Sequence, residues 1–275
     1  MIIYTSITNA YDEISDHHYY DPDVQYVCFT DGTVKQKGAW EFREIPITHE
    51  CPRRLSAYAK LNPHKLFPEG SNTVWIDGCY VITKQFIELS KYFFSISKRT
   101  HMRHPRKYTY LEEVMEGYMA AFNTREDVIE ITKALKEIEY DYKKYCSPVL
   151  ACIWRTIDAE INEFHDLWWK WSLVGPNRDQ ISFDTARQLT GLEWHVHESA
   201  DNYYRGVWPA VGINFDDKNS RQKIHPQKGQ MDQYKNERSL LLELQNITKM
   251  IYKLHYRGID KNFILRNIEP KLPRS

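Results

Sequence analysis

Short apolar runs and helical spacings alternate along the first hundred residues. Runs rich in β-branched and aromatic residues predict strands at residues 1–7, 25–30, 40–45 and 73–77. Helical spacing predicts helices at residues 53–61 and 84–95, the first lying between Pro52 and Pro63. Strands that repeatedly precede helices are typical of an α/β fold, here with a mostly parallel central sheet.

The pattern continues in the second half of the chain. It predicts helices at residues 110–122, 124–145 and 178–190, a strand at residues 149–155, and a helix or a loop at residues 158–172. The helix from residue 124 opens on a capping box, Thr124 with Asp127. Residues 199–232, rich in Asn, Asp, Gly and Gln, predict a long loop, and residues 233–257 predict an amphipathic helix. We therefore expect a main domain over residues 1–198 and an extension over residues 199–275.

Composition narrows the class of protein. The 275 residues, 42% hydrophobic, suffice for one large domain, and the 19 Tyr and 8 Trp suit sites for flat or sugar-like ligands. Five cysteines without paired spacing favour a reducing cytoplasm over a disulfide framework or a zinc site. No apolar run approaches the ~20 residues that span a bilayer, and the basic start of a signal peptide is missing, so we expect a cytoplasmic protein.

Charge is distributed unevenly although the net charge is zero. Residues 218–275 contain 13 Lys and Arg against 5 Asp and Glu, a net +8, which leaves −8 for residues 1–217. One interpretation is a solvated helix surface. The other is that an anionic macromolecule such as nucleic acid binds this basic segment, because clustered cations bind phosphate backbones.

The most informative segment is Thr73–Gly78, an apolar strand that stops on Asp77 and Gly78. Open α/β folds bind their ligands at the carboxyl ends of strands, where an aspartate meets a ribose or a metal ion. The alternative is a simple turn, since Asp-Gly is a common hairpin signal.

A series of further blocks accompanies this segment in a fixed order. They are Tyr4–Ile7 with Tyr11-Asp12, Tyr26–Asp31, Arg53-Arg54 with Lys60 and Pro63-His64, Trp75–Gly78, His104–Arg106 with Glu112-Glu113, Tyr145–Arg155, and Trp168-Trp169 leading to Arg178–Phe183. Together these blocks resemble a GT-A type glycosyltransferase family, formerly a domain of unknown function, with plant, bacterial and phage members. The resemblance covers roughly residues 1–190. It implies a Rossmann-like GT-A domain that uses a nucleotide sugar.

The resemblance also implies a donor site. Arg54 and Lys60 look like the family's basic pair that faces the nucleotide, placed at i and i+6 on one helical face, and Asp77 looks like its ribose-binding aspartate. Cations are needed there because the leaving diphosphate gains negative charge. The implied donor is a UDP-sugar, held in addition by Thr5, Gly78, Arg178 and Gln180.

Metal dependence stays open at this stage. The common Asp-x-Asp pattern would place a second carboxylate where Cys79 stands, and Mg²⁺ or Mn²⁺ prefers oxygen ligands. His195 and His197 are candidates for nitrogen ligands beside Asp77, although a His pair at this spacing is also compatible with a structural or acceptor-facing role.

Three carboxylates are candidates for the catalytic group. Asp179 follows a loop and begins a helix, where it either accepts the proton of the acceptor hydroxyl, holds sugar hydroxyls, or only caps the helix. Glu112 and Glu113 are the others, and because neighbours on a helix diverge by about 100°, at most one of them faces the site.

The acceptor is predicted from aromatic and cationic residues. The candidate acceptor residues are His104, Arg106, Trp168, Trp169, Tyr203 and Arg205. For Trp168 and Trp169 a role in the buried core is the alternative. With the basic segment they suggest hydroxymethylated pyrimidines of phage DNA, the protein then acting in the host cytoplasm. Two alternatives are a transferase for a surface polysaccharide or lipid-linked glycan, and an inactive scaffold that only binds nucleic acid.

Overall fold

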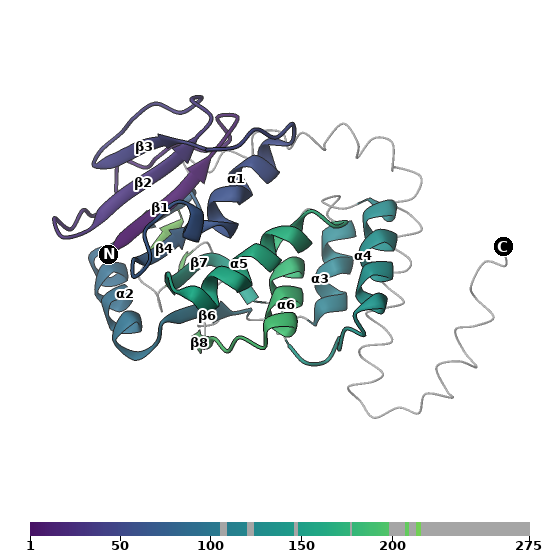
Figure 1. The fold of residues 1–275 in the computed structure, drawn as a ribbon. Coiled ribbons are helices and arrows are strands. Elements are labelled where there is room, and N and C mark those ends of the chain that lie inside the picture. Colours follow the sequence, from purple (N-terminus) through teal and green to yellow (C-terminus); the bar gives the residue numbers. More distant parts are fainter. Residues whose placement is uncertain are drawn as a thin grey trace. The chain divides into compact units, whose positions relative to one another are not determined.

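The structure is a computed structural model that describes residues 1–104, 109–119, 124–145, 148–176 and 178–197, and two short strands at 207–208 and 213–215. These residues all belong to one compact unit, Met1–Lys223. Figure 1 shows how its elements are arranged. The predictions for Arg106, Tyr203, Arg205 and the basic helix at residues 233–257 lie outside the described residues.

The main sheet has the strand order β3-β2-β1-β4-β7-β6-β8 within the described part of the chain. Its strands are β1 (Ile2–Ile7), β2 (Gln25–Thr30), β3 (Trp40–Glu44), β4 (Asn72–Ile76), β6 (Arg99–Arg103), β7 (Pro148–Thr156) and β8 (His195–His197). Strands β1 to β4 pair in parallel, as do β6 and β8, whereas β7 runs antiparallel to both of its neighbours. The predicted α/β fold with a mostly parallel sheet is confirmed.

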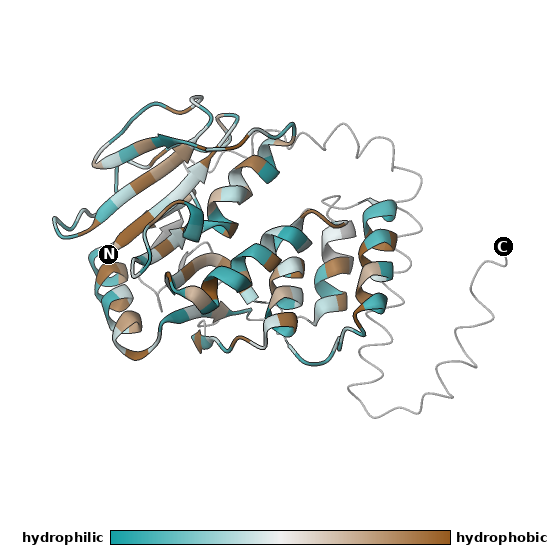
Figure 2. Cartoon of the chain, in the orientation of Figure 1, coloured by the Kyte–Doolittle hydropathy of each residue, from teal (hydrophilic) through white to brown (hydrophobic). Residues whose placement is uncertain are grey.

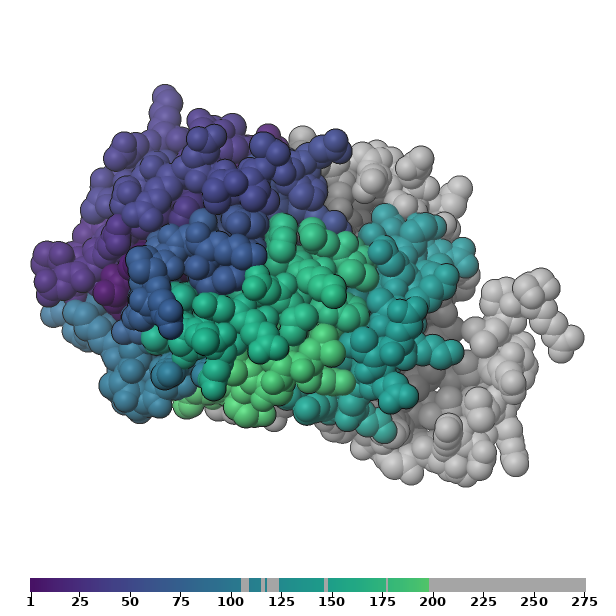
Figure 3. All heavy atoms as spheres, viewed as in Figure 1, coloured from purple at the N-terminus to yellow at the C-terminus, as the bar shows by residue number. Residues whose placement is uncertain are grey.

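Helices cover both faces of this sheet. On one face, α2 (Lys84–Ile96) packs its phenylalanines into a core with the side chains of β1, β4 and β7. On the other face lie α1 (Pro52–Leu61), α5 (Ala159–Ser172) and α6 (Asp179–Thr190), which share a second core, and the short turn η1 (Pro63–Lys65) follows α1. The helices α3 (Tyr110–Met119) and α4 (Arg125–Glu137) continue this row beside α6 around a third, smaller core. In the space-filling view, green atoms of α5 and α6 lie between the blue and purple N-terminal elements and the teal atoms of α4 (Figure 3).

Strand alternation decides which side chains face which layer. Tyr4 pairs in register with Trp75 and both face α1 and α5, whereas Ile3 pairs with Val74 and both face α2. The Tyr4 and Trp75 rings meet edge to face with centroids 5.4 Å apart. Hydrophobic residues therefore occupy both faces of the central strands, and the covering helices carry hydrophilic residues as well (Figure 2).

One predicted helix is too long, and one strand of the sheet is missing from the sequence predictions. The helix predicted at residues 124–145 keeps its Thr124–Asp127 capping box but ends at Glu137, because Glu139 adopts a left-handed φ of 51°. Strand β6 is not predicted, since its Arg-Thr-His-Met-Arg sequence lacks an apolar run and it forms by pairing between β7 and β8.

The expected loop over residues 199–232 also contains ordered pairing. Strands β9 (Val207–Trp208) and β10 (Ile213–Phe215) form a second, antiparallel sheet with β5 (Tyr80–Ile82), in the order β5-β10-β9. The loop prediction, which was based on polar composition, is therefore wrong for these two short strands. Among the described helices, none combines the length and the apolar character needed to cross a lipid bilayer.

Candidate active site

Asp77 lies where the apolar strand β4 ends, at the carboxyl edge of the parallel part of the sheet. The backbone N–H of Tyr80 donates to the carbonyl oxygen of Asp77 across 3.2 Å and so closes a turn. The strand that follows, β5, joins the second sheet and does not pair back on β4. The Asp-Gly pair thus makes a turn but no hairpin, and it leaves Asp77 at the edge where α/β folds bind ligands.

Two neighbours fix the Asp77 side chain. The indole N–H of Trp75 donates to Asp77 Oδ1 across 2.8 Å, which holds the carboxylate on the α1 face of the sheet. A Cβ on Gly78 would lie 3.1 and 3.2 Å from the side-chain carbons of Ile7 on β1. A side chain at position 78 would push Ile7 by a few tenths of an ångström, so glycine is the residue that fits this close approach to β1 without a shift.

Lys60 joins Asp77 to Asp179 over more than a hundred residues of sequence. Its ammonium forms an ion pair with Asp179 and lies 3.6 Å from Asp77 Oδ1, at 5.4 Å from the centre of the Trp75 ring. The Lys60 side chain is 9% exposed, whereas those of Asp77 and Asp179 are 41% and 20% exposed. Both carboxylates therefore reach solvent above a nearly buried cation. The structure thus brings together Lys60 and Asp77, which the sequence analysis assigns to the donor site, and their role there stays a prediction.

The three charges shift one another's pKa values. Burial alone would lower the pKa of Lys60, but the carboxylates of Asp179 and Asp77 raise it above its usual value. Burial opposes ionisation of Asp179, yet Lys60, Arg53 and Arg178 hold its pKa below the usual range. The pKa of Asp77 is raised, first by burial and then by the charge of Asp179. Asp179 is accordingly the permanent anion, and Asp77 is the more basic carboxylate of the two.

Arg53 is a residue of this site that the sequence reasoning missed. Residues i and i+6 on a helix lie about 240° apart, so the expectation that Arg54 and Lys60 share a face was wrong. Arg53 and Lys60 are seven residues apart and do share one, and Arg53 interacts electrostatically with Asp179. Arg54 instead donates to the carbonyl oxygen of Gly175 across 3.2 Å. Arg54 thus holds the loop before Asp179, and the i, i+7 spacing was the signal for Arg53.

The first turn of α6 is held from two sides. The indole N–H of Trp168 donates to the backbone oxygen of Asp179 across 2.9 Å. Arg178, which precedes the helix, forms an ion pair with Glu113 of α3. Trp168 is completely buried and Glu113 is 1% exposed. The acceptor contact predicted for Trp168 therefore does not fit its position, and Glu113 balances the charge of Arg178 in place of facing a substrate.

Glu112 has a structural partner of its own. Its carboxylate accepts from the backbone N–H of Thr109 across 2.7 Å and from the Thr109 hydroxyl across 2.8 Å. The Thr109 hydroxyl in turn accepts from the backbone N–H of Glu112 across 3.4 Å. This reciprocal arrangement is a capping box at the start of α3. Of the three candidate catalytic carboxylates, only Asp179 joins Asp77.

The remaining predicted residues lie at different depths. Thr5 is buried on the α2 face, opposite to Asp77, so direct donor binding does not fit its position. Gln180 follows Asp179 on the first turn of α6 and is partly exposed. His104 is buried just after β6. Trp169 is partly buried, with its ring edge to face against Tyr58 at 5.3 Å. The acceptor roles of His104 and Trp169 stay predictions.

The donor set near Asp77 does not fit a divalent cation. His195 and His197 lie on β8, three strands from β4, which corresponds to about 14 Å at the usual strand spacing. Ligands of one ion must all lie within about 2.6 Å of it, so these histidines cannot complete a shell with Asp77. A metal role for these histidines together with Asp77 does not fit this geometry. Across the described ranges no cluster of three or more His, Cys, Asp or Glu is arranged to hold a metal ion.

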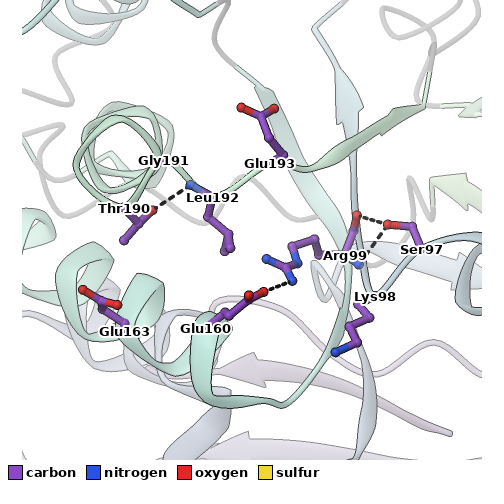
Figure 4. A pocket seen from close by; sticks show the side chains of 9 residues that line it. All are labelled: Ser97, Lys98, Arg99, Glu160, Glu163, Thr190, Gly191, Leu192 and Glu193. Carbon is purple, nitrogen blue, oxygen red and sulfur yellow. Dashed lines mark hydrogen bonds and ion pairs between the residues drawn. The ribbon is translucent and has the colours of Figure 1, made fainter.

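A surface hollow of about 540 Å³ lies elsewhere, at the opposite edge of the sheet. Residues 97–99 at the start of β6 form one side of it, and residues 190–193 after α6 form another. Figure 4 shows Arg99 pointing toward Glu160, with which it forms an ion pair at 2.6 Å. Because β4 and β6 run in the same direction, this hollow and Asp77 are at opposite ends of the strands. It therefore belongs to a different surface from the candidate site.

Comparisons with known proteins give structural neighbours only. No protein-family model matches the chain, and no curated protein matches it. Among solved structures it is similar to the galactosyltransferase LgtC in complex with donor and acceptor sugar analogues, with a TM-score of 0.43 and 12% identity over 78% of this chain and 86% of that one. It is also similar to mouse xyloside xylosyltransferase 1, with a TM-score of 0.42 and 8% identity over 71% and 84% of the two chains.

A third neighbour is the bifunctional glycosyltransferase WbbM, with a TM-score of 0.34 and 12% identity over 68% of this chain and 44% of that one. The three named neighbours are glycosyltransferases. At these identities and scores we argue function from the residues of the site itself.

Proposed function

We propose that the protein is a glycosyltransferase that moves a sugar from a nucleotide-sugar donor, a UDP-sugar by the family resemblance, to a hydroxyl group. The observation that carries this proposal is the Asp77–Lys60–Asp179 cluster at the carboxyl edge of β4. It combines solvent-reaching carboxylates with cations from α1, Lys60 and Arg53, and with Arg178 directly before α6. Ribose hydroxyls and a diphosphate need these two kinds of group side by side.

The reaction itself requires the charges that this cluster supplies. The bond between the anomeric carbon and the diphosphate oxygen breaks, a bond from the anomeric carbon to the acceptor oxygen forms, and the acceptor proton passes to a base. The nucleoside diphosphate leaves with one more negative charge than it carried as an ester. Arg53 and Arg178, both partly exposed beside Asp179, are the cations that meet this charge.

The two carboxylates suit different tasks. Asp179 stays ionised because three cations hold its pKa down, which suits an oxygen acceptor for sugar hydroxyls. Asp77 Oδ1 accepts a hydrogen bond from the Trp75 indole N–H, and this leaves Oδ2 for a ribose hydroxyl. Asp77 therefore fixes the donor, and Asp179 holds the transferred sugar.

A donor-hydrolysis assay tests the enzyme class. Purified protein is incubated with UDP-, GDP- and CMP-sugars, and the released nucleoside diphosphate or monophosphate is quantified. We expect release from one donor class, and Asp77→Asn should reduce it by about 10²-fold or more, since it removes one pre-organised electrostatic group. Asp166→Asn is the matched control, because Asp166 is an exposed carboxylate paired with Lys65 outside the site. No release from any donor by the native protein would favour the inactive-scaffold alternative.

The acceptor that we propose is a hydroxymethylated pyrimidine in DNA, and the net +8 of residues 218–275 supports it. The test is a gel-retardation series with duplex DNA at increasing salt, using the full chain and a chain truncated before residue 233. Strong salt-dependent retardation that is lost on truncation is expected. Equal binding by both chains would contradict the assignment.

Mass spectrometry of nucleosides from cells that express the protein identifies the acceptor directly. A hexose or pentose increment on a pyrimidine supports DNA modification and places the protein in the cytoplasm, or in the host cytoplasm for a phage protein. The same increment on surface glycans or lipid-linked sugars, with unmodified nucleosides, supports the glycan alternative.

A further inference from the structure

The Lys60 ammonium occupies the space between the two carboxylates of the candidate site. It forms an ion pair with Asp179, lies 3.6 Å from Asp77 Oδ1 and is covered on one side by the Trp75 ring at 5.4 Å. The side chain is 9% exposed and comes from the last turn of α1, which packs on β1. This position is central to the cluster and is determined by the fold, in contrast to a surface ion pair.

A divalent cation would have to share this position with an existing charge. Mg²⁺ or Mn²⁺ needs about six oxygen ligands near 2.1 Å, mostly from carboxylates, phosphates and water. Asp77 Oδ1 already accepts from Trp75, and Asp179 is engaged by Lys60. A metal ion bound by both carboxylates would lie within a few ångströms of an ammonium group, and this repulsion is strong in a partly buried site.

Cys79 removes the usual source of further negative charge. It stands where an Asp-x-Asp pattern would have its second carboxylate. A hard cation such as Mg²⁺ or Mn²⁺ prefers oxygen ligands, and the Cys79 side chain offers sulfur in place of a carboxylate.

Cations already engage the acidic groups of the cluster. Asp179 forms an ion pair with Lys60 and also interacts with Arg53 and Arg178, and Glu113 forms an ion pair with Arg178. Asp12 is a further carboxylate here, with its Cβ 3.6 Å from the position of a Cβ on Gly78. A divalent cation would have to displace these cations before it could use the Asp179 carboxylate as a ligand.

We infer that Lys60 is the built-in cation of this site, taking the place of a divalent metal between Asp77 and Asp179, so that nucleotide binding needs no metal ion. The inference rests on the proposed nucleotide-sugar function. Whether a metal ion can bind between Asp77 and Asp179 when Lys60 is absent can nevertheless be measured without any enzyme activity. Lys60 orients both carboxylates, and together with Arg53 and Arg178 it supplies the positive charge that the diphosphate meets.

The first experiment measures metal binding by the full chain. Tb³⁺ is titrated into the native protein and its luminescence is excited through tryptophan, since the Trp75 indole N–H contacts Asp77. We expect the Tb³⁺ luminescence of the native protein to be the same as that of Asp77→Asn, because Tb³⁺ does not bind at Asp77 while Lys60 is present. Lys60→Ala opens the space between the carboxylates and should raise Tb³⁺ affinity by about tenfold or more, and Lys60→Ala with Asp77→Asn should lose that gain.

Lys91→Ala is the matched control, because Lys91 forms an exposed pair with Asp21 at 2.9 Å on the surface of α2. It should leave Tb³⁺ binding unchanged. Native binding of Tb³⁺ that Asp77→Asn abolishes would overturn the inference, and this arm needs no variant at Lys60. A Lys60→Ala protein that folds, as judged by circular dichroism, but gains no Tb³⁺ binding would overturn it as well.

The second experiment measures nucleotide binding by calorimetry, with UDP, GDP and CMP as the probes, in EDTA and in Mn²⁺. The native affinity should agree within about twofold between the two conditions, whereas Lys60→Ala should weaken binding in EDTA by about 10- to 100-fold and recover part of it in Mn²⁺. Native binding that appears only with Mn²⁺ would refute the role of Lys60. If no nucleotide binds under either condition, the proposed function fails, and the Tb³⁺ result alone decides the question of Lys60.

Discussion

Arg155 donates to the backbone carbonyl oxygen of Lys60 across 2.8 Å, from a position on β7 where its own side chain is completely buried. Lys60 is in the last turn of α1, so its carbonyl oxygen lacks a partner within the helix. A cation at a helix C-terminus also interacts favourably with the helix dipole. Arg155 further bonds to the Tyr4 hydroxyl, and burial lowers its pKa. This guanidinium therefore fixes the end of α1 that presents Lys60 to the site.

Arg155→Lys should destabilise the protein by about 2 kcal/mol or more, because the buried charge remains while the forked hydrogen bonds are lost. Arg155→Met removes the buried charge together with those bonds, so we expect a smaller loss than for lysine. Urea unfolding measures both free energies. Arg43→Lys, at an exposed pair with Glu41, is the control and should stay within about 0.5 kcal/mol of the native protein. A larger loss for methionine than for lysine would contradict this account.

Arg53→Gln should weaken nucleotide binding by about tenfold, whereas Arg54→Gln should change it less. Arg53 lies on the Lys60 face of α1 and interacts with Asp179, while Arg54 donates to the backbone oxygen of Gly175. Calorimetry on both variants, with melting temperatures as the check on folding, makes the comparison. A larger effect of Arg54→Gln than of Arg53→Gln would support the original prediction that Arg54 and Lys60 face the nucleotide together.

This pair of arginines shows where sequence reasoning succeeds and where it stops. The apolar runs of β1, β2 and β4 and the glycine after Asp77 are local signals, so the parallel sheet and its ligand edge follow from them. Which of two adjacent arginines faces Asp179 depends on helical phase, and counting 100° per residue would have selected Arg53.

Other features depend on tertiary contacts that no local pattern contains. The sequence of β6 is polar and becomes a strand because β7 and β8 pair with it. The Trp168 side chain has the composition of a sugar-stacking group, yet the second core encloses it and turns its N–H to Asp179. The ion pair between Lys60 and Asp179 spans 119 positions, so only the fold brings the two residues together.

Gly175 and Gly191 both adopt a left-handed backbone conformation, but only Gly175 is crowded by its surroundings. Alanine substitutions at the two positions therefore distinguish the cost of backbone strain from the cost of a steric clash. The φ angles of the two glycines are 65° and 66°, but a Cβ on Gly175 would lie 2.5 Å from the backbone oxygen of Asp127, whereas a Cβ on Gly191 meets open space. Gly191→Ala should cost about 1 kcal/mol, from the left-handed conformation alone. Gly175→Ala should cost more, and by moving the loop that Arg54 holds it should also weaken nucleotide binding.

Thermal unfolding and nucleotide calorimetry on the two alanine variants check this prediction. Similar stability losses would show that the loop before Asp179 relaxes without cost. A Gly175→Ala protein with native nucleotide affinity would separate that loop from the site.

Asp184 should lower the stability of the protein as the pH rises. A salt-bridged carboxylate has the opposite effect, since the stability that it contributes is lost as the pH falls. The Asp184 side chain on α6 is completely buried, neither carboxylate oxygen has a hydrogen-bond partner among the described residues, and burial raises its pKa well above the usual value. Arg187 lowers this pKa and Glu113 raises it, but both effects are smaller than that of burial. Asp184 is therefore protonated in the folded protein at pH values where the unfolded chain has already lost the proton.

The sign of the effect follows from proton counting. Above the usual aspartate pKa near 3.9, the folded state binds one more proton than the unfolded state, so stability falls as pH rises toward the folded pKa. Asp184→Asn cannot ionise and avoids this loss. We expect the variant to be more stable than the native protein at pH 7 and to lose that advantage as the pH falls below about 4.

Melting temperatures of both proteins between pH 3 and pH 8 measure this difference. Asp166→Asn is the control of opposite sign, because hydrogen bonds from Lys65 and His64 outweigh burial and lower the pKa of Asp166. That variant should lose stability at pH 7 and approach the native protein at low pH. If Asp184→Asn is more destabilising at pH 7 than at pH 3, as expected for Asp166→Asn, the Asp184 carboxylate is ionised and paired in the folded state, and this account of its burial is wrong.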